Sequence, residues 1–292
     1  MPGRARLALL TAVVLWAISF VATKVALEEA SPLVVVTLRL LIAAVCFLPW
    51  VVVTGGVKGL GGLRRLPLLF VLSLFGTSLH YGLQTAGLQF TTASNASLYT
   101  TTGPITILLL SALVLGERIT ARKASGVVLA VAGVLVVMGA ESLSTFEFGR
   151  IKGDVLVIAS IVMWGLFTVF GKKLTDTLGA LRVTAWVTII GALSMVPVGC
   201  LEARATGFSM SSLTLDAWSA IAFLGVACSF LATLLYFVAL GLSESQKVGV
   251  YLYAIPPMTA VVASLYLGET VTSNLVIGAL LVIGGVALTE RG

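Results

Sequence analysis

The chain has 292 residues, of which 59% are hydrophobic and 10% are charged, and its mean hydropathy is +1.11. Soluble domains carry about 25% charged residues, so this composition excludes an ordinary water-soluble enzyme, a disordered chain and a disulfide-rich scaffold. The net charge of +6 is spread over short segments between apolar runs. It forms no basic stripe, so nucleic acid is not expected as a partner.

Apolar runs bounded by charged and turn residues predict an all-α integral membrane protein with ten transmembrane helices. Each run is close to the roughly 20 residues that cross a bilayer, and the segments between the runs are too short for a soluble domain. The predicted spans, in chain order, are 7–27, 32–53, 67–88, 93–115, 124–140, 154–173, 181–201, 217–240, 248–267 and 274–290.

Positive charge is divided unequally between the two sides of this arrangement. With the amino terminus in the cytoplasm, twelve Lys and Arg residues fall on the cytoplasmic side and three on the other. Cytoplasmic loops of membrane proteins are enriched in Lys and Arg, so we expect both termini in the cytoplasm of a bacterial inner (plasma) membrane. The twelve are Arg4, Arg6, Lys58, Arg64, Arg65, Arg118, Arg122, Lys123, Lys172, Lys173, Lys247 and Arg291, and the three are Arg150, Lys152 and Arg204.

The two halves of the chain resemble each other. Residues 104–136 and 256–288 share ten identities at a constant offset of 152, including a proline, a Gly-Glu pair and two further glycines. Five helices per half is an odd number, so the second half enters the membrane from the opposite side. This predicts a five-plus-five inverted-topology repeat around a central cavity, a recurrent architecture of secondary transporters. The predicted repeats are residues 1–148 and 149–292.

Several residues of the first two spans carry a family resemblance. Trp16, Lys24, Ser31-Pro32 and Arg39, in this order, resemble the first two helices of the drug/metabolite transporter superfamily, EamA type. The segments around the two Leu-Gly-Glu motifs resemble the end of that family's repeat. The resemblance implies a ten-helix exporter or exchanger of small metabolites, and the family includes amino-acid exporters of the YddG kind.

The third span carries the clearest polar stripe in the chain. Its polar and small residues recur every three or four positions, which places them on one face of a helix, while leucine and phenylalanine occupy the other face. A polar stripe within a membrane helix is typical of a cavity wall. The stripe consists of Ser73, Gly76, Thr77, His80, Tyr81, Gln84 and Gly87.

We expect a central cavity lined by aromatic and polar side chains from helices of both halves. Rings would contact the apolar part of a zwitterion or attract its ammonium group, and hydroxyls and His80 would hydrogen-bond its carboxylate. The alternative is that the hydroxyls bond their own helix backbone and the rings only pack. The candidate substrate-binding residues are Trp16, His80, Tyr81, Gln84, Ser97, Tyr99, Trp164 and Tyr236.

Prolines occupy symmetric positions in the fourth and ninth spans. Pro104, Pro256 and Pro257 each lack a backbone donor and would leave free the carbonyl four residues earlier. We expect them to act as gating hinges, and the alternative is a fixed kink that only shapes packing.

Charged residues within the spans are few, and no Asp or Glu lies in the middle of any span. Ion-coupled carriers usually need such a carboxylate, so facilitated transport or exchange is favoured, with proton coupling through His80 as the alternative. Arg39 lies deep in the second span and is expected to be structural, pairing with Glu28, Glu29 or helix carbonyls. Glu117 and Glu269 are expected to cap the helices that follow them.

These features together predict a transporter that exports small metabolites by alternating access, amino acids including aromatic ones first. The alternatives are a multidrug or cation exporter, and an exchanger of sugar phosphates or nucleotide sugars. A membrane receptor or enzyme would need a catalytic or metal-binding cluster that the spans do not show. No cofactor or metal is expected, and the expected partners are a small-molecule substrate and the lipid bilayer. We expect a monomer or a weak homodimer.

Overall fold

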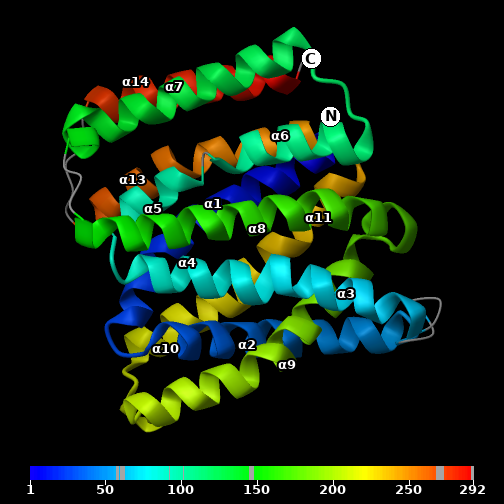
Figure 1. The fold of residues 1–292 in the computed structure, drawn as a ribbon, viewed down its shortest axis with the longest axis vertical. Helices are drawn as coiled ribbons and strands as arrows, with labels where there is room; N and C mark the ends of the chain where they lie inside the picture. Colours follow the sequence, from blue (N-terminus) through cyan, green and yellow to red (C-terminus); the bar gives the residue numbers. More distant parts are fainter. Residues whose placement is uncertain are drawn as a thin grey trace.

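The computed structural model of the chain describes residues 1–56, 59, 63–91, 93–100, 102–144, 148–267 and 273–290, and within these the only regular secondary structure is helical. Most helices run roughly parallel or antiparallel to one another in a single bundle, and the two chain ends lie on the same side of it (Figure 1). The first half consists of α1 Gly3–Leu27, α2 Pro32–Val53, η2 Leu63–Arg65, α3 Leu66–Ser73, η3 Leu74–Leu79, α4 His80–Leu88, α5 Ala93–Tyr99, α6 Thr102–Leu115 and α7 Ala121–Ser144.

The second half has the same kinds of element. It consists of α8 Phe148–Leu178, α9 Ala180–Thr206, η4 Met210–Ser212, α10 Leu215–Phe223, η5 Leu224–Ala232, α11 Thr233–Gly241, α12 Ser245–Gly249, η6 Val250–Ala254, α13 Ile255–Leu267 and α14 Ser273–Glu290.

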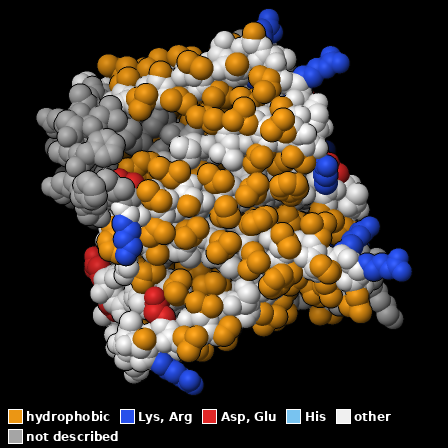
Figure 2. Space-filling model, in the orientation of Figure 1, with side chains coloured by type: hydrophobic (Ala, Val, Ile, Leu, Met, Phe, Trp, Pro, Cys, Tyr) orange, Lys and Arg blue, Asp and Glu red, His pale blue; other side chains and the backbone are white. Residues whose placement is uncertain are grey.

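Within the described residues, seven helical segments are long and apolar enough to cross a membrane, judged by length and composition. Hydrophobic side chains cover most of the face seen in Figure 2, and the charged side chains gather mostly near its margins. The chain is therefore a multi-pass membrane protein. The seven segments are Gly3–Leu27, Pro32–Val53, Leu63–Leu88, Lys152–Leu178, Ala180–Thr206, Leu215–Gly241 and Ser245–Tyr266, and two shorter apolar helices are Thr102–Leu115 and Val276–Thr289.

Two of these long segments change their winding in the middle. The segment that ends at Leu88 contains the π-helix η3, and the segment that ends at Gly241 contains the π-helix η5. Such π turns within α-helices occur often at functional sites. At Gly76 in η3, a Cβ atom would lie 2.2 Å from a ring carbon of Phe167, so the wider turn brings the backbone directly against this ring.

Helices α7 and α14 pack side by side at one edge of the bundle (Figure 1). A Cβ atom on Gly126 would lie 2.7 Å from the carbonyl oxygen of Gly285, and one on Gly133 would lie 2.6 Å from that of Gly278. The repeated glycines of the two halves therefore face each other and let the two backbones approach closely.

Candidate functional site

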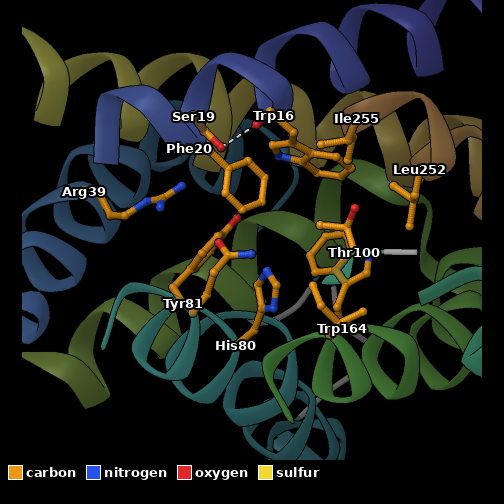
Figure 3. A pocket seen from close by; sticks show the side chains of 12 residues that line it. Trp16, Ser19, Phe20, Arg39, His80, Tyr81, Thr100, Trp164, Leu252 and Ile255 are labelled. Carbon is orange, nitrogen blue, oxygen red and sulfur yellow. Dashed lines mark hydrogen bonds between the residues drawn. The ribbon is translucent and has the colours of Figure 1, made fainter. Parts of the chain in front are cut away.

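A cavity lies between helices of both halves; the space that atoms leave unfilled there, open solvent included, is about 480 Å³. Residues of α1, α2, α4, α8 and the α5–α6 segment contribute to its wall, together with Leu252 of η6 and Ile255, the first residue of α13. Its lining combines aromatic rings, one cation and a few hydrogen-bonding groups (Figure 3). The lining residues are Trp16, Ser19, Phe20, Arg39, His80, Tyr81, Gln84, Thr100, Ile161, Trp164, Leu252 and Ile255.

Aromatic rings form a connected cluster at one end of this cavity. The rings of Trp16 and Trp164 meet edge to face with their centroids 5.1 Å apart, and Trp164 also lies 5.1 Å from the ring of His80. Tyr236 packs 5.3 Å from both tryptophan rings. Pairs with this geometry attract each other beyond simple burial, so the cluster holds α1, α4, α8 and α11 in fixed positions around the cavity.

His80 is fixed by a hydrogen bond to the opposite half of the chain. Its Nδ1 lies 2.8 Å from the backbone carbonyl oxygen of Ser160 in α8, and the side chain is buried. A carbonyl oxygen can only accept, so Nδ1 carries a proton and donates it. In the neutral ring, Nε2 is then a hydrogen-bond acceptor.

Arg39 projects from α2 into the cavity and is only 2% exposed. Its Nε donates a hydrogen bond of 2.9 Å to the hydroxyl of Ser229, and its guanidinium carbon lies 4.1 Å from the centre of the Tyr81 ring. Among the described residues, Arg39 forms no ion pair. The expected partner Glu29 instead accepts hydrogen bonds from the backbone N–H and the hydroxyl of Thr214.

Five of the eight predicted binding residues line the cavity, namely Trp16, His80, Tyr81, Gln84 and Trp164. Tyr236 lies behind the tryptophans, where its hydroxyl is 3.2 Å from that of Thr168. Ser97 donates to the carbonyl oxygen of Ser94 within its own helix, and Tyr99 packs against the hydrophobic core. These three residues are not among those that line the cavity, and Thr100 is the lining residue from their segment.

The remaining lining residues had weak sequence signals. Ser19 and Phe20 lie three and four positions after Trp16, so they share its face of α1. Ile161, Leu252 and Ile255 are apolar, and an apolar cavity residue cannot be told from a lipid-facing one by residue type. Arg39 had a clear signal, because it is a lone arginine deep in a span. The sequence could not tell whether its side chain points into the cavity or toward neighbouring helix carbonyls and carboxylates.

The three prolines lie at the starts of helices. Pro104 is the third residue of α6, and Pro256 and Pro257 are the second and third residues of α13. A proline in the first turn of a helix costs no internal hydrogen bond. The carbonyls four residues before Pro104 and Pro256 also accept hydrogen bonds, that of Thr100 from the N–H of Gly103 and that of Leu252 from the N–H of Ile255. The expectation of freed carbonyls is therefore wrong for Pro104 and Pro256.

Glu117 caps a helix of the opposite half, not the helix that follows it. Its carboxylate accepts hydrogen bonds of 2.8 and 3.2 Å from the backbone N–H groups of Ser245 and Gln246 at the start of α12. The first N–H groups of a helix lack partners within the helix, and the fold brings those of α12 closer to Glu117 than those of α7. Glu269, its counterpart, lies outside the described residues.

An ion pair stands beside this cap. Lys123 in α7 donates to the carboxylate of Glu244, just before α12, and also to the carbonyl oxygen of Arg118 at 3.1 Å. Burial raises the pKa of Glu244, but the hydrogen bond and charge of Lys123 outweigh burial, so this pKa lies below its ordinary value. The α6–α7 connection is thus tied twice to the start of α12.

The chain is similar to known proteins in both sequence and fold. Residues 4–139 and 151–291 each match the family model described as the EamA-like transporter family. An "uncharacterized transporter" of Archaeoglobus fulgidus is 32% identical over 99% of this chain and 98% of its own. A "probable amino-acid metabolite efflux pump" of Salmonella typhimurium is 28% identical over 97% and 93%. One solved crystal structure superposes with a TM-score of 0.81 at 21% identity, covering 100% of this chain and 98% of the other.

Proposed function

Because the chain belongs to the EamA-like transporter family, we propose that this membrane transporter exports amino acids, including aromatic ones, and related small metabolites. The observation that carries the proposal is the cavity itself, where Trp16, Trp164 and Phe20 offer apolar contact beside Arg39, His80 and Gln84. A zwitterion with an apolar side chain matches this combination of rings and hydrogen-bonding groups. The relative from Salmonella typhimurium, named as a probable amino-acid metabolite efflux pump, adds support.

The proposed architecture has ten crossings in two inverted repeats, residues 1–148 and 149–292. Three observations support it. The family model matches twice, once in each half. The π-helices η3 and η5 interrupt the third and eighth predicted spans, which are equivalent positions of the two halves. The glycine contacts of α7 with α14 also pair the last helices of the two halves.

We propose that both termini face the cytoplasm, in the plasma membrane of a bacterium, with the protein acting as a monomer or weak homodimer. The excess of Lys and Arg on one side supports this orientation. In the described part of the chain, most basic side chains visible in Figure 2 lie toward the edge where Figure 1 places the chain ends. Lys58 and Arg291, two of the twelve cytoplasmic cations in the predicted topology, lie outside the described residues.

In this orientation Arg39 and Gln84 lie in the outer parts of α2 and α4, whereas the lining residues Leu252 and Ile255 lie nearer the cytoplasmic side, shortly after α12. The cytoplasmic side carries the cap of Glu117 on α12 and the ion pair of Lys123 with Glu244. We infer that the contacts of Glu117 and Lys123 close the cytoplasmic side of the bundle. Opening toward the cytoplasm would then require these contacts to break. The hinges of this movement would lie where α5 is followed by α6 and where η6 is followed by α13, beside Pro104, Pro256 and Pro257.

The experiment that tests the proposed function uses purified full-length protein in liposomes loaded with a labelled amino acid. A panel of the twenty standard amino acids should show faster release than from protein-free liposomes for at least the aromatic members. If no member of the panel is released faster, amino-acid export is wrong for this protein.

A second experiment tests the proposed mechanism of facilitated transport or exchange. Arg39 and His80 are the only titratable lining residues besides Tyr81, and none of the twelve lining residues in the described chain is an acid. Flux of a transported amino acid should therefore not change when a pH gradient is imposed on the liposomes. A clear acceleration would contradict uncoupled transport and favour proton coupling.

A further inference from the structure

Arg39 carries a buried charge that no described residue neutralises. Its side chain is 2% exposed, and neither an Asp nor a Glu of the described residues forms an ion pair with it. Burying an uncompensated guanidinium inside a membrane protein is costly. The hydroxyl of Ser229 and the ring of Tyr81 offset part of this cost, because a hydroxyl accepts a hydrogen bond and a ring face attracts a cation. Neither supplies a negative charge.

The free donors of Arg39 face the cavity. The one hydrogen bond of its guanidinium within the described residues uses Nε, so both Nη groups are without a protein partner there. Figure 3 shows the guanidinium directed toward Phe20 and the space beside Tyr81. A planar pair of N–H groups with this freedom matches the two oxygens of a carboxylate.

His80 offers a hydrogen-bonding character opposite to that of Arg39. Nδ1 of His80 donates to Ser160, so Nε2 of the neutral ring accepts. Gln84 also lines the cavity, and its amide, which makes no hydrogen bond among the described residues, can donate to a carboxylate or accept from an ammonium group. An acceptor nitrogen repels a carboxylate and attracts an ammonium group. In this arrangement His80 would meet the ammonium group, whereas from the sequence we expected it to meet the carboxylate.

We propose that Arg39 is the anion-binding residue of the cavity and that it selects substrates carrying a single carboxylate on an apolar body. The apolar body would lie against the edge-to-face pair of Trp16 and Trp164 and the ring of Phe20. A single guanidinium fits one carboxylate and not a phosphate dianion, which would need more cations. This inference rests on the proposed function and names its substrate class.

The test measures how well three compounds compete with the release of labelled phenylalanine from liposomes. Phenylalanine carries both charged groups, 3-phenylpropionate only the carboxylate, and phenethylamine only the ammonium. With the wild-type protein, 3-phenylpropionate should compete at least about tenfold better than phenethylamine, as expected for a charged hydrogen-bonded pair. In Arg39→Gln this preference should disappear, while competition by phenethylamine is kept.

Two further variants make the result specific. Arg39→Lys keeps the charge but loses the planar pair of donors, so carboxylate competition should fall severalfold. Lys24→Gln removes a cation of α1 that does not line the cavity, so it should keep the wild-type preference. An unchanged preference in Arg39→Gln overturns the proposal. If Arg39→Gln does not fold, an unchanged preference in Arg39→Lys overturns it instead.

A binding measurement separates this inference from the proposed function. The same three compounds are added to detergent-solubilised wild type and Arg39 variants, and the melting temperature is recorded. If the wild type does not transport phenylalanine, the proposed function fails. A carboxylate-dependent rise in melting temperature that disappears without Arg39 would still support the inference. If no such rise occurs with either carboxylate, the inference is overturned.

Discussion

Trp16 and Trp164 meet edge to face, with their ring planes at 84° and their centroids 5.1 Å apart. One ring comes from α1 in the first half of the chain and the other from α8 in the second. Both also line the cavity. The same contact therefore joins the two halves and forms part of the substrate-binding wall that we propose.

Replacing Trp164 with Ala should reduce flux of aromatic amino acids at least about tenfold per folded protein, because the cavity loses its central ring and the contacts with Trp16 and His80. Trp164→Phe keeps a ring and should retain more flux. The measurement is liposome flux normalised to monodisperse protein. Trp50→Ala is the control, since Trp50 is 46% exposed near the end of α2. Normal flux in Trp164→Ala would contradict the assignment.

Replacing Glu117 with Ala should lower the stability of the protein by about 1–2 kcal/mol, the usual cost of losing a helix cap. The N–H groups of Ser245 and Gln246 would lose their acceptor. Thermal unfolding in detergent measures this as a lower melting temperature. Glu28→Ala, at an exposed position between α1 and α2, serves as the control. Equal melting of Glu117→Ala and the wild type would show that the cap does not stabilise the fold.

Replacing Gly76 with Ala should destabilise the protein by about 1–3 kcal/mol, the range for overpacking in a filled interior. The new methyl group would lie 2.2 Å from a ring carbon of Phe167, so either the ring or η3 must move. Gly82→Ala in α4 is a matched control, because its methyl group would meet only a Leu33 carbon at 3.8 Å. Similar melting temperatures for the two variants would contradict the close approach.

Glu29 should make stability dependent on pH in the acidic range. Hydrogen bonds from the hydroxyl and the backbone N–H of Thr214 lower the pKa of Glu29 below its ordinary value of 4.5. A group whose folded pKa is depressed stabilises the fold above its ordinary pKa and loses that effect as pH falls through the folded pKa. Glu29→Gln should thus melt below the wild type at pH 7, with the difference shrinking below pH 4.5. A constant difference across this range would contradict the assignment.

Sequence patterns predicted the helices well but not their winding. The predicted span 32–53 coincides with α2, and 67–88 differs by one residue from the stretch that begins at Leu66. Length and apolar composition decide where a membrane helix lies. The π-helix η3 brings Gly76 against Phe167, a residue distant in the sequence, and no local pattern reports such a contact.

Five of the twelve lining residues of the cavity were among the predicted binding residues. Of the seven stripe residues of the third span, His80, Tyr81 and Gln84 line the cavity. Ser73 and Thr77 instead donate to carbonyl oxygens of their own helix. Ser97 satisfied its hydroxyl within its own helix, an alternative that residue type cannot distinguish. Glu117 was assigned to the wrong helix because its partners are 128 and 129 residues away.

The carboxylate of Glu202 in α9 accepts hydrogen bonds of 2.8 and 3.1 Å from the N–H groups of Leu33 and Val34, the beginning of α2. Glu202 follows Leu33 by 169 residues. During synthesis, α2 is therefore complete before Glu202 exists, so those two N–H groups lack this acceptor until the second half is made. The first half is therefore synthesised with the start of α2 uncapped, and the cap is supplied by Glu202 of the second half. Expressing residues 1–148 alone would leave that end without its partner.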